Sequence, residues 1–369
     1  MISSKRKLLF SLLILVLILG IFVNIFFYLK YLNEKRKIEI FSKEKKEIFS
    51  QIPLKREKEN TTLNTLNIKN AKWKEIVSFA PWSKRDAQTI AVFKDKIYLL
   101  GGVSGIYPDY SDVKSDVWVS ENGKDWKLVL KKAPFGKRRG HETVIFKNKI
   151  WVLGGVEKGE IFLNDVWASE DGKNWKLIVK EAPWLPRKGF EVVVFKNKMW
   201  LMGGVTPRGV VNDIWVSEDG KNWSLVKKHA DWSPRYDIAG EIFEGKIWLT
   251  GGVVPGEWKG KKDVWFSEDG KDWKLALKKA PFPGRHGHCL ISFKDYLWII
   301  GGWSGYGKGY NDVWFSKDGK EWHFLGKAPW KGREDLSCFV FEDKIWILGG
   351  MFSNGKRAND VWYLTFEEF

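Results

Sequence analysis

The chain has 369 residues, of which 44% are hydrophobic and 29% charged, so it can bury a sizeable core and is not disordered as a whole. Its two cysteines exclude a disulfide-rich scaffold and a cysteine-rich metal site, and its five histidines leave little room for a multi-histidine centre. The formal net charge of +17 is concentrated in part near the N-terminus, where residues 30–72 carry twelve positive and six negative side chains. The charge therefore does not indicate nucleic-acid binding, and we expect no nucleic-acid partner.

The N-terminal segment is typical of a membrane anchor. Residues 8–29 are uncharged and almost entirely apolar, and Lys5, Arg6 and Lys7 precede them. As a helix, such a stretch reaches about 33 Å, enough to cross a hydrocarbon core of about 30 Å. A cleaved signal peptide is the alternative, but its apolar stretch would be shorter and would end in small residues. The pattern predicts a basic tail (1–7), an uncleaved transmembrane signal anchor, and a single-pass membrane protein whose remainder lies outside the cytoplasm.

Residues 30–70 are predicted to form a charged stalk or linker. Ile38, Phe41, Ile48 and Ile52 fall at helix-like spacing among lysines and glutamates, before a loose polar stretch. This stalk is either a short coiled coil or a solvated spacer.

Residues 71–369 contain one sequence motif repeated six times. Each copy has an Arg, a Phe eight residues later, a Gly-Gly pair eight and nine residues after the Phe, and then an Asp-x-Trp. The Gly-Gly pairs recur at intervals of 48 to 53 residues, at 101–102, 154–155, 203–204, 251–252, 301–302 and 349–350. A period in this range indicates a repeat architecture built from one small structural unit.

Each copy predicts four short strands. In the third copy, residues 192–195 and 199–202 are apolar, and a charged turn separates them. The Asp-x-Trp marks a third strand, and the Trp that follows an Asp-Gly or Asn-Gly pair begins a fourth. These dipeptides are the strongest short hairpin signal, because both central residues of the tightest hairpin turn need positive φ. A four-stranded antiparallel sheet repeated in this way predicts one β-propeller blade per copy.

The two ends of the repeat region predict how the ring closes. The sixth copy stops after its third strand, which contains Trp362, and the missing fourth strand begins before the first copy, at Trp73. A strand near Trp73 that completes the last blade would join the ends of the ring and remove exposed edges. The predicted fold class is all-β: a six-bladed propeller with four-stranded antiparallel blades, preceded by one transmembrane helix.

The Gly-Gly pair after the second strand, the Trp further on and the period of 48 to 53 residues resemble kelch repeats over residues 71–365. The resemblance implies a six-bladed kelch-type propeller. Kelch propellers include interaction modules, a copper-radical galactose oxidase and sialic-acid mutarotases, so the resemblance implies a fold and not one chemistry.

A copper site like that of galactose oxidase is not expected. His141 and His288 occupy the same repeat position in the second and fifth copies, which lie opposite one another in a ring of six. They are then too far apart to share a metal at ligand distances of about 2 Å. We expect no metal and no cofactor.

Residues present in every copy are interpreted first as structural. The Asp of the Asp-x-Trp is expected to accept backbone hydrogen bonds in the turn before the third strand. The Arg at the start of each first strand has two interpretations, an anion-attracting funnel or a structural hydrogen bond to a neighbouring blade. The six arginines are Arg85, Arg138, Arg187, Arg235, Arg285 and Arg333.

Cys289 and Cys338 lie in the first strands of adjacent copies but one position out of phase. We interpret both as buried thiols rather than as a disulfide.

The antiparallel strand order predicts two different faces. The loops between second and third strands and the segments that enter each first strand share one face, which we call the loop face. The opposite face carries only short charged turns, and we call it the hairpin face. The loop face varies between copies and is rich in aromatic residues, which suits recognition, although these rings could simply cap the loops.

The candidate ligand-binding residues come from these loops and from the variable positions after each repeated Arg. Those positions hold Asp86, Arg139, Lys188, Tyr236, His286 and Glu334, followed in two copies by Asp237 and Asp335. The candidates are Tyr107, Tyr236, Asp237, Trp258, His286, Trp303, Tyr306, Tyr310, Glu334 and Asp335, with Arg235 and Arg333.

The sequence favours a recognition module that binds a glycan or a protein through its loop face. The alternative is a carbohydrate-modifying enzyme such as a sialic-acid-mutarotase-like isomerase, for which Asp237, Glu334 and Asp335 could supply a carboxyl pair. A scaffold that uses the charged hairpin face is a third possibility. No nucleophile elbow, phosphate-binding loop or metal-ligand spacing occurs in the sequence, so no catalytic residue is assigned.

Overall fold

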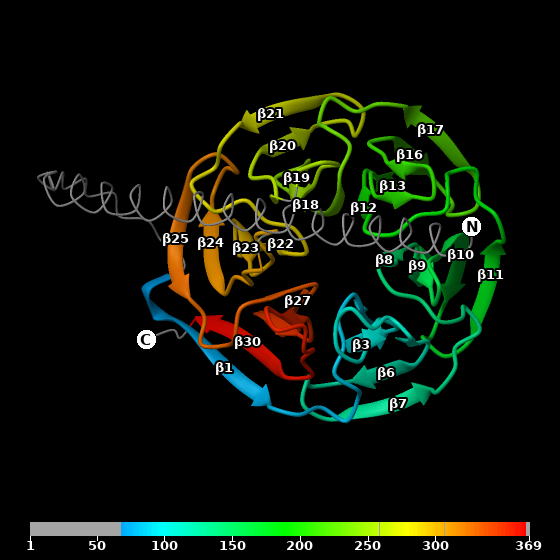
Figure 1. Cartoon of the computed structure of the whole chain (residues 1–369), viewed down its shortest axis with the longest axis horizontal. Helices are drawn as coiled ribbons and strands as arrows, with labels where there is room; N and C mark the ends of the chain where they lie inside the picture. Colours follow the sequence, from blue (N-terminus) through cyan, green and yellow to red (C-terminus); the bar gives the residue numbers. More distant parts are fainter. Residues whose placement is uncertain (1–67, 258, 306, 367–369) are drawn as a thin grey trace, which may run out of the picture. The chain divides into compact units, whose positions relative to one another are not determined.

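The computed structural model describes residues 68–257, 259–305 and 307–366, which form six four-stranded antiparallel sheets arranged in a ring (Figure 1). A 3-10 helix over Ile68–Asn70 leads into the ring. The predicted basic tail and membrane anchor, and the stalk up to residue 67, lie outside the described residues. Within the described residues, no helix has the length and apolar character needed to span a membrane.

The strands follow the repeat, with the first strand of each blade next to the axis and the fourth at the rim (Figure 1). The first three blades contain β2 (Thr89–Phe93), β3 (Lys96–Leu100), β6 (Val117–Ser120) and β7 (Trp126–Leu130); β8 (Glu142–Phe146), β9 (Lys149–Glu157), β10 (Ile161–Ser169) and β11 (Trp175–Val179); and β12 (Glu191–Phe195), β13 (Lys198–Met202), β16 (Ile214–Ser217) and β17 (Trp223–Lys227).

The other blades repeat this order. They contain β18 (Tyr236–Phe243), β19 (Lys246–Val253), β20 (Val264–Ser267) and β21 (Trp273–Leu277); β22 (Cys289–Phe293), β23 (Tyr296–Ile300), β24 (Asp312–Ser316) and β25 (Trp322–Lys327); and β27 (Ser337–Phe341), β28 (Lys344–Leu348), β30 (Val361–Phe366) and β1 (Ala71–Val77). Three two-stranded ribbons lie in the loops: β4 (Val103–Ser104) with β5 (Asp112–Val113), β14 (Val205–Thr206) with β15 (Gly209–Val210), and β26 (Arg333–Glu334) with β29 (Met351–Phe352).

The predicted closure of the ring is confirmed. The last blade has the order β27-β28-β30-β1, and β1 pairs antiparallel with β30, with Trp73 opposite Leu364. The rings of Trp73 and Trp330 meet edge to face at 5.6 Å, so the closing strand is held by packing as well as by its ladder. Figure 1 shows the two ends of the repeat side by side in this sheet.

The two hairpins of each blade use different turn chemistry. In the turn between β12 and β13, Lys196 and Asn197 both have left-handed φ, of 49° and 57°, as a two-residue turn requires. In the hairpin between β10 and β11, only Gly172 does, and Asp171 instead accepts the backbone N–H groups of Lys173 and Asn174. The Asp-Gly pair therefore marks a hairpin, as predicted. The expectation that both residues have positive φ was wrong, because the hydrogen bonds of the Asp side chain form a longer loop.

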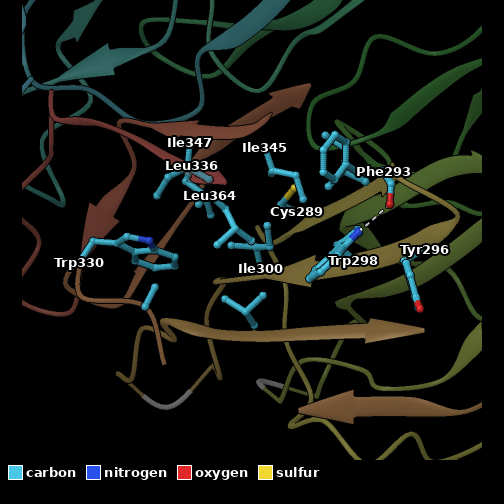
Figure 2. Close-up of a cluster of buried hydrophobic side chains, with 13 residues drawn as sticks. Cys289, Phe293, Tyr296, Trp298, Ile300, Trp330, Leu336, Ile345, Ile347 and Leu364 are labelled. Carbon is cyan, nitrogen blue, oxygen red and sulfur yellow. Dashed lines mark hydrogen bonds between the residues drawn. The ribbon is translucent and has the colours of Figure 1, made fainter. Parts of the chain in front are cut away.

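The hydrophobic core of the described residues is divided into six clusters, and each cluster is formed mainly by side chains of two neighbouring blades. Figure 2 shows the cluster that joins the fifth and sixth blades, with Trp298 and Trp330 both buried. The Trp298 indole N–H donates to the carbonyl of Phe293 at 3.0 Å, so this large side chain is buried without an unpaired donor. The aromatic residue of each second strand, except Trp298, packs against the glycine in the third-to-fourth-strand hairpin of the next blade. A Cβ on Gly220, for example, would clash with the Trp151 ring.

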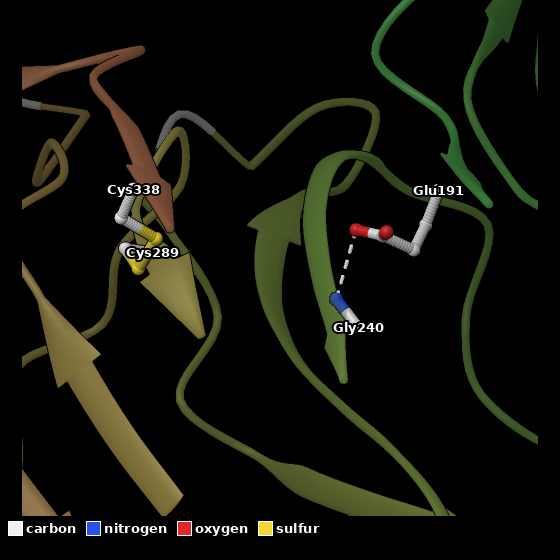
Figure 3. The surroundings of a disulfide bond; sticks show 4 residues. All are labelled: Glu191, Gly240, Cys289 and Cys338. Atoms are coloured by element: carbon white, nitrogen blue, oxygen red, sulfur yellow. Dashed lines mark hydrogen bonds between the residues drawn. A yellow bond between two sulfur atoms is a disulfide. The ribbon is translucent and has the colours of Figure 1, made fainter. Parts of the chain in front are cut away.

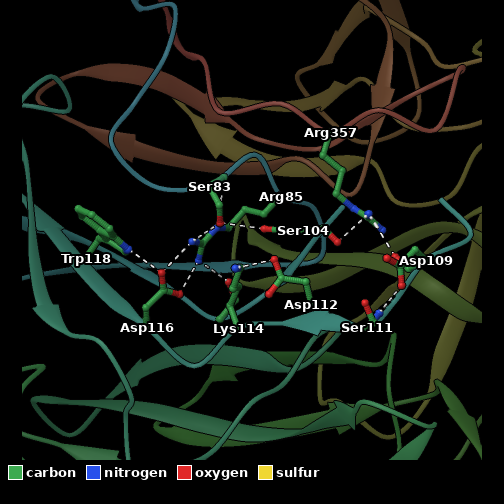
Figure 4. A network of polar contacts seen from close by, with 11 residues as sticks. Ser83, Arg85, Ser104, Asp109, Ser111, Asp112, Lys114, Asp116, Trp118 and Arg357 are labelled. Carbon is green, nitrogen blue, oxygen red and sulfur yellow. Dashed lines mark hydrogen bonds and ion pairs between the residues drawn. The ribbon is translucent and has the colours of Figure 1, made fainter. Parts of the chain in front are cut away.

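The repeated Arg and Asp form one buried ion pair per blade, as Figure 4 shows for the first blade. Arg85 donates to both carboxylate oxygens of Asp116 at 2.7 and 2.8 Å and to the carbonyl of Gly101 at 2.8 Å. Asp116 also accepts the Trp118 indole N–H, so its main partners are side chains, and the backbone bonding that we expected is limited to its own N–H. The Arg backbone carbonyl accepts the N–H of a glycine in the preceding blade, as Arg85 does from Gly350 at 2.9 Å, so the repeated Arg is structural.

This network corrects the expectation for Arg235 and Arg333. Each is 1% exposed and is bonded to an Asp of its own blade, Asp263 and Asp360 respectively. Their guanidinium groups therefore offer no surface to a ligand and form no anion funnel.

Cys289 and Cys338 form a disulfide between β22 and β27, with their Cα atoms 6.1 Å apart, so the expectation of free thiols was wrong (Figure 3). Their difference in phase is the reason. Each inner strand has one face toward the preceding blade and one toward the next, and residues at the same repeat position face the same way in every blade. Two side chains that meet between neighbouring blades must therefore come from opposite faces of their strands, and successive residues alternate between these faces. An offset of one position therefore brings the two sulfur atoms together.

Replacing both cysteines by serine is expected to lower the free energy of unfolding by about 2–4 kcal/mol, because the bond closes a chain segment with a sequence separation of 49. Urea unfolding of wild type and variant, each with and without reductant, measures this. Reductant should lower the midpoint of the wild type to that of the variant and leave the variant unchanged. Equal midpoints for oxidised and reduced wild type would contradict the prediction.

Candidate functional site

Six residues at the start of the inner strands form a closed ring of backbone hydrogen bonds around the propeller axis. Each lies two positions after the buried Arg of its blade and has a left-handed φ between 50° and 58°. Each N–H donates to the carbonyl of the equivalent residue in the preceding blade, at 2.7 to 3.3 Å. The six residues are Ala87, Gly140, Gly189, Asp237, Gly287 and Asp335. This ring of hydrogen bonds fixes the backbone of these six residues and of the residue before each, and so the points from which their side chains extend.

Asp237 and Asp335 occupy this ring although its left-handed backbone favours glycine. Asp tolerates the conformation better than most residues but still carries strain relative to Gly. Each carboxyl group lies over the glycine of the preceding blade, Asp237 over Gly189 and Asp335 over Gly287, where a Cβ would clash with a carboxylate oxygen. Strained non-glycine residues of this kind concentrate at functional sites.

A cavity of about 440 Å³ lies at the mouth of the axis on the loop face. Bridges such as those of Asp86 with Val103 and of His286 with Trp303 join the loops to the inner strands, which confirms the predicted placement of both kinds of segment on one face. Residues from every blade line the cavity, among them Asp86, Tyr107, Tyr110, Arg139, Lys188, Tyr236, Asp237, His286, Trp303, Glu334, Asp335 and Phe352.

The acidic side of the cavity is built by the fourth to sixth blades. His286 Nδ1 lies 3.8 Å from Asp237 Oδ2 and 3.6 Å from Glu334 Oε2, too far for good hydrogen bonds. Burial raises the pKa of Asp237 to about 6, and burial with the neighbouring carboxyl groups raises the pKa values of Glu334 and Asp335 further above their ordinary range. Burial lowers the pKa of His286 to about 4. Like charges this close cannot all ionise, so the group holds protons at neutral pH.

The basic side is built by the second and third blades, and its two cations share one carboxylate. Arg139 and Lys188 both pair with Glu160, and the Lys188 Nζ lies 2.6 Å from Glu160 Oε2. The Arg139 guanidinium also stacks 4.0 Å from the centroid of the Tyr110 ring. A third cation, Arg357, is fully buried and bonds Asp86 at 2.8 Å.

A second group of carboxyl groups lies further along the inner strands, outside the cavity. Burial raises the pKa of Glu142 to about 8 and that of Glu241 to about 7. Burial raises the pKa of Glu191 as well, and this carboxylate accepts the N–H of Gly240 in the next blade at 2.8 Å (Figure 3). The stability of the folded ring therefore depends on the protonation of these groups and of Asp237.

We expect the free energy of unfolding to fall by about 1–2 kcal/mol between pH 5 and pH 8 on account of Asp237, whose folded-state pKa is raised to about 6. An acid with a raised folded pKa binds its proton more tightly in the folded state, so the stability it contributes at low pH is lost as the pH rises through that pKa. Denaturant unfolding at both pH values should show a smaller fall for Asp237→Asn. The control is Asp95→Asn, an exposed left-handed Asp (φ 56°) on the hairpin face. Identical pH slopes for all three proteins would contradict the assignment.

The structure brings most of the predicted site residues together. Tyr107, Tyr236, Asp237, His286, Trp303, Glu334 and Asp335 all line the one cavity. Tyr310 instead lies over the Arg285 guanidinium at 4.8 Å from its ring centroid, and is half-buried. Trp258 and Tyr306 lie outside the described residues.

Sequence reasoning missed Arg357 and Glu160, which pair with cavity residues. Arg357 lies three positions before the repeated Asp, where the other copies carry Val, Phe or Gly. A charged residue at this otherwise uncharged repeat position was the sequence feature that could have identified it. In the described part of the chain, no three His, Cys, Asp or Glu side chains are grouped as potential metal ligands.

No family model matches the chain, and no curated protein matches its sequence. Its structure is similar to the solved structure of YjhT, with a TM-score of 0.65 and 17% sequence identity. The similarity covers 79% of this chain and 100% of YjhT. At that identity the similarity shows the fold alone, and with the six-bladed arrangement it supports a kelch-like β-propeller.

Proposed function

We propose that the propeller is a recognition module whose axial cavity binds a carbohydrate, most simply the terminal part of a glycan. The observation that carries this proposal is a single cavity that combines aromatic faces with carboxyl groups that lack a protein donor within the described residues. Its volume of about 440 Å³ is in the range of small-ligand sites. A protein partner would need a larger contact surface around the same mouth.

The chemistry of the lining suits a sugar. Tyr107 is 51% exposed and Trp303 is partly exposed, so both rings have surface available for the apolar face of a pyranose. Asp237 and Glu334 offer acceptors for hydroxyl groups, and Lys188 offers a donor. Buried polar groups that a ligand must satisfy give specificity, because an analogue lacking the matching hydroxyl leaves them unpaired.

A glycan array with the full chain in detergent tests this function. Trp303→Ala is expected to weaken binding by about tenfold or more, because it removes a stacking surface of the cavity. Phe324→Ala is the matched control, since this ring is 53% exposed on the rim strand β25, outside the cavity. Binding that survives Trp303→Ala, or that is lost equally in Phe324→Ala, counts against the cavity.

A carbohydrate-modifying enzyme is the second candidate, and one observation favours it. Neutral His286 lies between Asp237 and Glu334, whose raised pKa values provide a protonated acid beside a neutral base. Such a pair could move a proton to and from a sugar ring oxygen. Anomer interconversion of sialic acid and related sugars, followed by NMR, tests it; rates equal to those in buffer would eliminate this candidate.

We also propose that the propeller is anchored in a membrane and faces away from the cytoplasm. The disulfide between Cys289 and Cys338 supports this placement, because such bonds persist in oxidising compartments. Alkylation in denaturant of protein taken directly from cells should leave both cysteines unmodified without reductant and should modify both after reduction. Ready modification before reduction would contradict the placement.

A further inference from the structure

Three carboxyl groups of the cavity lack the partners that buried acids normally have. Within the described residues, the carboxyl groups of Asp237, Glu334 and Asp335 form no hydrogen bond and no ion pair with Lys or Arg, and only His286 Nδ1 approaches Asp237 and Glu334, at 3.8 and 3.6 Å. Glu334 is only 7% exposed and still lines the cavity, so its acceptors are directed at whatever the cavity holds. Burying an acid without a partner is costly, which means that a ligand group is the natural partner.

The cations around the mouth act on Asp237 and Asp335 only from a distance, because their ion pairs are formed with other carboxylates. Arg357 bonds Asp86, while Arg139 and Lys188 share Glu160. Among the described residues in and around the cavity, five carboxyl groups face three cations, and the three carboxyl groups without an ion-paired Lys or Arg all come from the fourth to sixth blades. The same side also holds the titratable groups Tyr236 and His286, and the His286 Nδ1 is buried without a hydrogen-bond partner.

Aromatic rings line the same cavity. Tyr236 and Trp303 come from the fourth and fifth blades, with Trp303 bridged to His286, and Tyr107 comes from the loop of the first blade. An ammonium group placed among these acids favours their ionised form. It is then attracted both to the carboxylates and to the aromatic faces, most strongly where water is excluded. A neutral hydroxyl group would gain only the hydrogen bonds.

The backbone indicates that these acids are not incidental. Asp237 and Asp335 stand at ring positions where three other blades have Gly and one has Ala. Gly189 and Gly287 leave the space in which the two carboxyl groups lie. The chain thus accepts left-handed strain at two positions in order to present acids to one cavity.

We propose that the acidic side of the cavity, formed by Asp237, Glu334 and Asp335, is a subsite for a primary ammonium group, so that the preferred ligand is an amino sugar. This inference rests on the proposed carbohydrate-binding function and narrows its substrate class. The ammonium group lies among the three carboxyl groups, and the sugar ring extends toward Trp303 and Tyr107.

The experiment measures binding of four probes to the full chain in detergent by calorimetry and saturation-transfer NMR. The probes are glucosamine, glucose, N-acetylglucosamine and cyclohexylamine, which separate the free amine from the sugar ring. Glucosamine is expected to bind about tenfold or more tightly than glucose or N-acetylglucosamine, because hydrogen bonds between charged groups are stronger than neutral ones.

Two variants identify the residues responsible. Glu334→Gln combined with Asp335→Asn keeps shape and leaves neither side chain able to ionise beside an ammonium group, and Asn tolerates the left-handed φ of 50° at position 335. This double variant is expected to bind the three sugars alike, while its unfolding midpoint stays at or above that of the wild type. Asp95→Asn makes the matched change in an exposed left-handed Asp on the hairpin face and should leave the preference for glucosamine intact.

The outcomes separate the two proposals. Equal binding of glucosamine and glucose, or a preference that survives in the double variant, overturns the ammonium subsite and leaves the carbohydrate site standing. Binding of cyclohexylamine without any of the sugars supports the ammonium subsite and overturns the carbohydrate function. Absence of binding by both amines overturns the inference.

Discussion

Replacing Arg285 by leucine is expected to lower the free energy of unfolding by about 3–5 kcal/mol, because it leaves a buried carboxylate without its cation. Arg285 is fully buried and donates to both carboxylate oxygens of Asp312 at 2.8 Å and to the carbonyl of Gly301 at 2.7 Å. Asp312 is itself only 8% exposed. Without Arg285, the Trp314 indole N–H and the backbone N–H of Asp312 itself would be the described donors left on that carboxylate.

A double-mutant cycle measures this coupling. Asp312→Leu in the Arg285→Leu background should recover part of the loss, since removing both partners is far less costly than removing one. Burial acts to raise the pKa of Asp312, but Arg285 and Trp314 hold it below its ordinary value, so the pair stabilises above pH 4 or so and fails in acid. Arg208→Leu, at an exposed loop position, is the control. A loss below about 1 kcal/mol for Arg285→Leu would show that the pair is not a structural requirement.

Deleting residues 71–77 is expected to abolish cooperative unfolding of the propeller. The deletion removes the whole of β1, exposes the edge of β30 and uncovers Trp330, which is 2% exposed in the closed ring. A sheet left with an open hydrophobic edge is prone to pair with other chains, so the deleted protein should also aggregate.

A milder change checks the same point in a folded protein. Trp73→Ala is expected to cost about 2–3 kcal/mol, less than a fully buried Trp, because this ring is partly exposed. Glu75→Ala, in the same strand but exposed, should change the free energy of unfolding by less than about 0.5 kcal/mol. Thermal and urea unfolding measure both. A two-state transition with an unchanged midpoint after deletion would contradict closure by β1.

The fold could be predicted because the repeat encodes it many times over. The Arg, the Gly-Gly pair and the Asp-x-Trp recur in every blade, and the missing strand at one end matches the surplus strand at the other. What the repeat could not predict are contacts that require the blades to be placed in space. The meeting of Cys289 and Cys338 depends on which face of each inner strand turns toward its neighbour, and the partner of Asp116 proved to be a side chain 31 positions before it.

The site was predicted from the opposite kind of signal, the positions where copies differ. Residues directly after the repeated Arg, such as Tyr236, His286 and Glu334, do line one cavity. The pairs that decide its charge were not predicted, because Arg357 and Asp86 are separated by 271 positions and meet only when the ring closes. Variation between copies therefore locates the site, whereas its electrostatic character depends on loops from different blades.

We propose the mouth of the propeller axis as the ligand site. A crystal structure of the full chain soaked with glucosamine tests this placement. We expect density in the cavity on the loop face, with the amine among Asp237, Glu334 and Asp335 and the ring against Trp303. Density on the hairpin face or the rim, with the cavity occupied by water alone, would contradict it.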